Sequence, residues 1–180
     1  MNFEHFKNRS FCLLIRSLIF FCCMFLGGCV LQSAQPIFAD KDAKLLLATI
    51  GQQFVTYNKV DGKWEKQKDL IKFSQVGNHY LVHDKSGDIT VLFVPLKDNW
   101  WALQATEKDK ASNYLLVQSQ GKTLLIYFLA CKDLKAQPNP SGSIVFDHED
   151  CSATAKMRKT EFFALSKNIS EAVLRIEAVN

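Results

Sequence analysis

Residues 89–94 read ITVLFV and residues 123–130 read TLLIYFLA, and these two apolar runs decide the fold. Both runs are rich in β-branched and aromatic side chains, and both are short and bounded by turn-forming residues, which is typical of strands and not of helices. Pro95 ends the first run, and the polar segment 119–122 comes directly before the second. Neither run alternates between polar and apolar residues, so we predict that both are central, buried strands.

Shorter segments of the same kind surround these two runs. Residues 70–76, 79–83, 100–105, 114–118, 143–146 and 173–179 are also predicted to be strands. Most of the strands follow one another at a spacing of about 10–12 residues and are joined by short polar turns. These turns leave no room for the crossover helices that a parallel sheet needs. The predicted fold class is therefore mainly β (α+β), an antiparallel meander that forms a curled sheet or a small barrel.

Two segments are predicted to be helical. Thr160 can cap a helix whose apolar side carries Phe162, Phe163, Leu165 and Ile169. We expect this C-terminal helix to pack on one face of the sheet or to plug one of its ends. Residues 41–57 combine a leucine-rich start with an aromatic, β-branched end, which indicates a short N-terminal helix that continues into a strand.

The first 39 residues have the pattern of an export signal. Lys7, Arg9 and Arg16 form a basic start, and the uncharged run SLIFFCCMFL follows at residues 17–26. Ten residues of helix rise only about 15 Å, which is too short to cross about 30 Å of bilayer hydrocarbon. We therefore expect residues 1–39 to be an export signal and residues 40–180 to form a single β-rich envelope domain.

Two cleavage sites compete within this segment. The sequence Leu26-Gly27-Gly28-Cys29 resembles a bacterial lipobox, which implies cleavage before Cys29 and a lipid on its thiol that anchors the chain to a membrane. The alternative is signal peptidase cleavage after Ala39, where the small side chain suits the peptidase. The apolar segment after Cys29 (VLQSAQPIFA) counts against a lipoprotein, because a lipoprotein tether is usually polar and flexible.

Composition excludes one class of partner and suggests one covalent link. Removing residues 1–39 leaves 22 − 3 = 19 basic and 18 − 1 = 17 acidic residues, a net charge of +2, so there is no electrostatic case for nucleic acid. Four of the six cysteines lie in the export segment. The remaining pair, Cys131 and Cys151, is predicted to form a disulfide in an oxidising compartment.

The sequence offers weak signals for catalysis or metal binding. On a strand His79 and His83 share a face but lie about 13 Å apart, too far for one metal ion. Residues 147–151 (DHEDC) combine carboxylates, an imidazole and a thiol, a pattern more typical of a solvated turn. Residues 84–88 (DKSGD) lack the full calcium-loop pattern. We therefore predict no catalytic residues, no metal site and no cofactor.

Aromatic residues give the candidate binding surface. Trp100 and Trp101 are adjacent, so on a strand they point to opposite faces, and one of them can be exposed. Trp64 and Tyr80 are predicted to join that exposed tryptophan in a patch for a ligand or partner.

These features favour an exported bacterial cell-envelope protein that acts as a non-enzymatic binding module. The expected partner is an envelope protein, a lipid or a cell-wall component, and the expected location is the periplasm or cell envelope, lipid-anchored through Cys29 or else secreted. Two alternatives stay open: a carrier that holds a small apolar ligand within the barrel, and an enzyme without a recognisable motif that uses His79 or His83 with Asp84.

Overall fold

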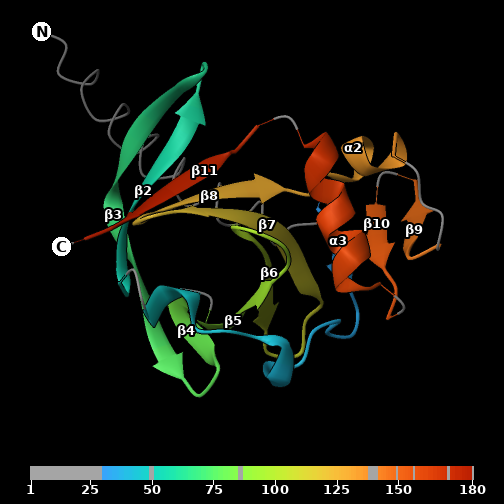
Figure 1. Cartoon of the computed structure of the whole chain (residues 1–180), viewed down its shortest axis with the longest axis horizontal. Helices are drawn as coiled ribbons and strands as arrows, with labels where there is room; N and C mark the ends of the chain where they lie inside the picture. The colour runs from blue at the N-terminus through green and yellow to red at the C-terminus, as the bar shows by residue number, and fades with distance from the viewer. Residues whose placement is uncertain are drawn as a thin grey trace, which may run out of the picture.

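A closed antiparallel barrel of eight strands forms the body of the protein (Figure 1). The computed structural model describes residues 30–48, 51–84, 87–137, 142–148, 150–155, 157–169 and 171–179. The barrel strands are β2 (Gln53–Val60), β3 (Lys63–Val76), β4 (His79–Asp84), β5 (Gly87–Pro95), β6 (Trp100–Glu107), β7 (Ser112–Gln120), β8 (Thr123–Phe128) and β11 (Leu174–Ala178). The predicted mainly-β fold, with antiparallel strands and a packed helix, is confirmed. The predicted lipid site, Cys29, lies outside the described residues.

The barrel is a meander that its last strand closes. Strands β2 to β7 each pair with the next strand along the chain, and every pair is antiparallel. Strand β11 then lies between β2 and β8, with Ile176 opposite both Thr56 and Leu124. A closed sheet has no free edge, so each barrel strand has a neighbouring barrel strand on both sides.

A second layer covers one side of the barrel (Figure 1). It contains β1 (Gln32–Ser33), β9 (Ile144–Asp147), β10 (Asp150–Ala153), α2 (Cys131–Lys135) and α3 (Lys159–Leu165). Strand β1 pairs with the start of β7 and with β10, so β9 and β10 continue the sheet beyond the barrel wall. Three 3-10 turns complete the described elements: η1 (Asp40–Asp42), η2 (Leu46–Ala48) and η3 (Ser166–Asn168).

The two layers create two hydrophobic cores. One core fills the barrel with inward side chains such as Phe93 and Leu115, and the other lies between the outer wall and the second layer, with Val94 and Leu116. Strands β5 and β7 therefore bury both faces, which explains why ITVLFV does not alternate. Strand β3 instead leaves most of one face in solvent, and its one buried residue is Phe73.

The C-terminal helix differs from its prediction in position and in cap. Helix α3 begins at Lys159 and not at Thr160, and the Glu161 carboxylate accepts a hydrogen bond from the Arg158 N–H at 2.9 Å. This carboxylate, near the positive end of the helix, does the capping predicted for the threonine hydroxyl. The helix packs on the outside of the barrel through Phe162 and does not plug an end.

Residues 30–39, which come before the expected domain boundary at residue 40, pack against the barrel and its second layer. Phe38 is 4% exposed and lies between the rings of Tyr114 and Phe162, with centroids 6.2 and 5.5 Å away. Its N–H donates to Oε1 of Gln104 at 3.0 Å, and its carbonyl accepts from Nε2 of the same side chain at 3.2 Å. Which of the two cleavage sites is used stays a prediction.

The predicted disulfide joins Cys131 to Cys151, with Cα atoms 5.4 Å apart. It links the first residue of α2 to β10, both within the second layer. Residues 147–151, predicted to be a solvated turn, span the end of β9, a turn at His148 and the start of β10, and the exposed side chains of Asp147 and His148 agree with the prediction. Among the described residues, no helix is long and apolar enough to cross a membrane.

Replacing both cysteines, Cys131→Ser with Cys151→Ser, is expected to lower the free energy of unfolding by about 3 kcal/mol, because the chain without the link gains the entropy of a loop whose ends are separated by 20 residues in sequence. Thermal unfolding of the purified protein with and without a thiol reductant measures this loss. The reductant should bring the wild-type protein to the melting temperature of the double variant and leave that variant unchanged. Equal melting temperatures for oxidised wild type and the double variant would contradict the expectation.

Candidate functional site

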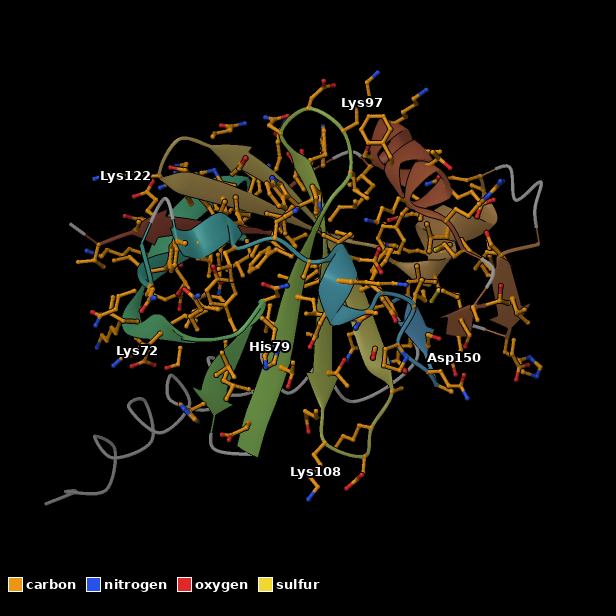
Figure 2. All side chains as sticks on the ribbon, turned by 60° about the horizontal axis from the view of Figure 1, so that its bottom comes forward. Lys72, His79, Lys97, Lys108, Lys122 and Asp150 are labelled. Atoms are coloured by element: carbon orange, nitrogen blue, oxygen red, sulfur yellow. A yellow bond between two sulfur atoms is a disulfide. The ribbon has the colours of Figure 1, made fainter. Side chains whose placement is uncertain are left out.

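The two ends of the barrel differ. At one end, here called the closed end, lie the turns β3–β4, β5–β6 and β7–β8, and at the other, here called the open end, lie the turns β2–β3, β4–β5 and β6–β7. Figure 2 shows Lys97 and Lys108 on turns at these opposite ends. The 3-10 turn η2 covers the closed end, where Leu47 is fully buried in the barrel core.

Aromatic packing fills the closed half of the barrel. The rings of Phe54, Phe73, Tyr80 and Phe93 contact one another edge-on or tilted, with centroids 5.6 to 6.2 Å apart. The Tyr80 hydroxyl accepts a hydrogen bond from the Ala48 N–H at 3.1 Å, which fixes η2 in place. Burial raises the pKa of Tyr80 above its usual value, so the ring stays neutral and apolar in this half.

A cavity occupies the half of the barrel toward the open end. Its lining residues are Val30, Ile71, Phe73, Val82, Ile89, Leu103, Ala105, Asn113, Leu115, Ile126 and Leu174. The centre of a water-sized sphere can move through about 80 Å³, and the atom-free space including the mouth is about 680 Å³. The first value describes the free interior, which is small. Among the lining residues, Ile71 and Ala105 are partly exposed, whereas the other nine are buried.

Asn113 is the only polar residue among the described residues that line the cavity. It takes an inward position on β7, between the outward residues Ser112 and Tyr114, and is 7% exposed. Its Oδ1 is buried and has no hydrogen-bond partner. A buried acceptor without a partner costs about 1–3 kcal/mol, so the cavity holds one uncompensated polar atom on an apolar wall.

An ion pair stands beside this wall near the open end. Glu107 is the next inward position on β6 after Ala105, and it is 6% exposed. The ammonium group of Lys110, in the β6–β7 turn, pairs with its carboxylate. The pair compensates the one carboxylate that β6 turns inward at this end, so the cavity wall itself stays neutral.

The four aromatic residues predicted to form one surface do not lie together. Tyr80 is fully buried inside the barrel, so its assignment to an exposed patch is wrong. The reason is strand parity, since Tyr80 shares the inward face of β4 with Val82. Trp101 packs against the barrel core, whereas Trp100 lies outside against Tyr127, with ring centroids 5.1 Å apart.

Trp64 belongs to a separate cluster on the outer face of β11, β2 and β3. The Arg175 guanidinium lies 4.1 Å from the ring centroid of Tyr57 and 5.3 Å from that of Trp64. The ammonium group of Lys59 lies 5.9 Å over the same tryptophan ring. A hydrogen bond to the Glu177 carboxylate raises the pKa of Tyr57. This cation–π stack fixes the base of the β2–β3 hairpin, which extends beyond its neighbours in Figure 1.

The histidines considered for catalysis lie away from the cavity. His83 is exposed on the outer face of β4 and pairs with Asp88 at 2.5 Å, while Nδ1 of His79 lies 3.7 Å from Asp40. Neither histidine lines the cavity. No group of three or more His, Cys, Asp or Glu side chains is placed to hold a metal ion within the part of the chain that the structure describes.

Comparison with known proteins yields no relative. No protein-family model, no curated protein and no solved structure matches the chain. Any statement on function therefore depends on the geometry of this chain.

Sequence reasoning did not find Asn113 or the cavity. The segment 112–120 contains a strand with both faces buried, so its apolar pattern does not reveal which residues point inward. The available signal was the asparagine itself, because asparagine is depleted in strands and one within an apolar strand needs a reason.

Replacing Asn113 by leucine is expected to raise the free energy of unfolding of the ligand-free protein by roughly 1 kcal/mol, since the unpartnered acceptor disappears and the apolar wall becomes continuous. Chemical denaturation measures the change. Gln104→Leu is the matched control, because this equally buried amide is hydrogen-bonded to both backbone groups of Phe38. That change should destabilise the protein by about 2 kcal/mol, as it leaves a buried N–H and carbonyl without partners. Destabilisation by Asn113→Leu comparable to the control would show that the asparagine has a structural partner.

Proposed function

We propose that this protein is an exported binding protein of the bacterial cell envelope that holds a slender apolar ligand inside its barrel. The observation that carries the proposal is the apolar cavity at the open end, with a single unpartnered acceptor, Oδ1 of Asn113, on its wall. Barrels of eight strands are just wide enough to be filled by side chains or to hold one small ligand. Here the aromatic cluster fills only the closed half.

The chemistry of the wall defines the ligand. Ten of the eleven lining residues are apolar, so binding is driven by removing hydrocarbon from water. The acceptor on Asn113 favours a ligand with one O–H or N–H donor placed along an otherwise apolar body. The small free interior favours a flexible chain, which can adapt to the available space, over a fused ring system. This arrangement follows the general pattern of small-molecule sites, in which apolar walls supply affinity and a few polar groups fix orientation.

The cavity supports binding in preference to the two other interpretations of the sequence. A surface for a protein partner was expected from four aromatic residues, but Tyr80 is buried and Trp64 lies on a different face from Trp100. A catalytic use of His79 or His83 has no support from their positions outside the cavity.

The packing of residues 30–38 supports cleavage before Cys29 and lipidation of its thiol. Cleavage after Ala39 would remove Phe38, expose the second core and leave the buried amide of Gln104 without its two partners. It would also remove β1, whose pairing with β7 and β10 joins the two layers. The apolar sequence after Cys29, which fits a flexible tether poorly, is explained as a folded segment.

Filling the cavity is expected to abolish ligand binding while the barrel stays folded. The probe is cis-parinaric acid, a linear fatty acid that fluoresces in apolar surroundings. It is added to the protein that is purified after the full-length gene has been expressed and the cell has processed its product. Ala105→Trp places an indole in the partly exposed lining position and should lower the affinity at least about tenfold, equal to about 1.4 kcal/mol. Thr90→Trp, which adds the same side chain on the outer face of β5, is the matched control and should bind as wild type does. Absence of binding to the wild-type protein, or equal binding by all three, would refute the ligand site.

The mature N-terminus is expected to be Cys29 carrying lipid. Mass spectrometry of the N-terminal peptide from membrane fractions should give the mass of a Cys29 peptide with diacylglycerol, and Cys29→Ser should abolish both the lipid mass and the membrane association. A free amine on Asp40 in the wild-type product would overturn the lipid anchor.

A further inference from the structure

The cavity and the proposed lipid anchor meet at one place in the chain. Val30 lines the cavity, is 9% exposed and bridges to Ala130. The next residue, Leu31, is fully buried and donates its N–H to the Leu129 carbonyl at 2.9 Å. Cys29 precedes Val30 directly, and adjacent Cα atoms are about 3.8 Å apart. A lipid on Cys29 is therefore attached one residue before Val30, which lines the cavity.

The open end also carries side chains that suit a membrane surface. Val60, at the end of β2, is 43% exposed, and Trp64 follows it on the other side of the hairpin turn. Lys59 lies beside them, and Lys63 is exposed at the start of β3. Tryptophan is enriched at the level of lipid headgroups, and lysine can lay its alkyl stem on apolar surface while its charge stays in water.

The same end carries a second hollow, lined by Lys59, Gly62, Phe128, Glu171, Ala172 and Val173. It lies between the hairpin turn and the segment that leads into β11, and Phe128 is followed within two residues by Ala130, the bridge partner of Val30. The opposite end is closed by η2, whose Leu46 and Leu47 are buried. The η2 turn thus covers one end of the barrel, whereas the residues that line the cavity lie toward the other end, near Val30.

We infer that the barrel stands with its open end against the bilayer and that its ligand is an acyl chain of a membrane lipid, which passes directly from the membrane into the cavity. This inference rests on the proposed function and adds the source of the ligand and the orientation of the protein. The lipid chain supplies the slender hydrocarbon that the small cavity accepts. A hydroxyl or amide near the head of such a lipid supplies the donor that Oδ1 of Asn113 lacks.

The positions of the tryptophans allow a direct test of orientation. Trp64 lies at the open end, and Trp100 lies at the closed end, directly after the β5–β6 turn. Two variants of the full chain each keep one of them: Trp100→Phe with Trp101→Phe, and Trp64→Phe with Trp101→Phe. Both are reconstituted into phosphatidylethanolamine–phosphatidylglycerol vesicles that contain phospholipid with brominated acyl chains, which quench nearby indoles. Trp64 should lose most of its fluorescence, and Trp100 should keep most of it. Equal quenching, or stronger quenching of Trp100, would overturn the orientation.

A second arm identifies the source of the ligand without changing any tryptophan. Wild-type protein in vesicles that contain a parinaroyl phospholipid should take up the fluorescent chain, and Ala105→Trp should not, whereas Thr90→Trp should behave as wild type. If anchored wild type takes up nothing but Cys29→Ser binds free cis-parinaric acid, the protein's own acyl chain fills the cavity and the inference is wrong. If no form binds free cis-parinaric acid, the proposed function itself fails. If the anchored wild type binds the free acid but takes up no chain from the vesicles, the transfer of an acyl chain from the membrane is refuted and the proposed function stands.

Discussion

The pairing of β11 with both β2 and β8 is the constraint on which the rest of the structure depends. Without β11, strands β2 to β8 would form an open antiparallel sheet with two free edges, and the cavity would be open between β2 and β8. A long insertion separates Phe128, the end of β8, from Leu174, the start of β11. This insertion folds on the outside of the barrel and brings the chain back to the position between β2 and β8. The Cys131–Cys151 disulfide shortens that insertion covalently, close to its start. The second layer therefore contributes to the closure of the barrel.

Two-sided burial determines how much of the fold could be predicted from the sequence. The runs ITVLFV and TLLIYFLA identified central strands correctly because β-branched and aromatic side chains favour strands on either face. On β5 and β7 the same burial hid the direction in which each residue points. The error at Tyr80 has a different cause: β4 is short and buries one face only, and its alternation places Tyr80 with Val82 inside the barrel. Strand β1 is only two residues long and lacks any pattern of its own. Helix α3 was found at the right place, but its cap depends on Glu161, which can reach back to Arg158 only in the folded turn.

The candidate site could not be predicted in the same way, because it is made of ordinary core residues. The residues that line the cavity come from the strands β3, β4, β5, β6, β7, β8 and β11, together with Val30, and none forms a local motif. What distinguishes the site is the space that they leave and the one acceptor without a partner. Both properties arise from the relative placement of distant strands. The export pattern, in contrast, is formed by neighbouring residues and can be recognised in the sequence. The packing of Phe38 adds a reason to prefer cleavage before Cys29 over cleavage after Ala39.

The two cores also give the barrel unequal walls. The side formed by β5 to β8 is clamped between the barrel interior and the second layer, so any shift of Leu103 or Leu115 must move Ala102 or Leu116 as well. The side formed by β3 and β4 is supported from within only, by Phe73 and Val82, and meets water on its other face. If the cavity holds the ligand proposed above, we expect the expansion that this ligand requires to fall on β3 and β4, while the wall packed on both faces keeps Asn113 in place.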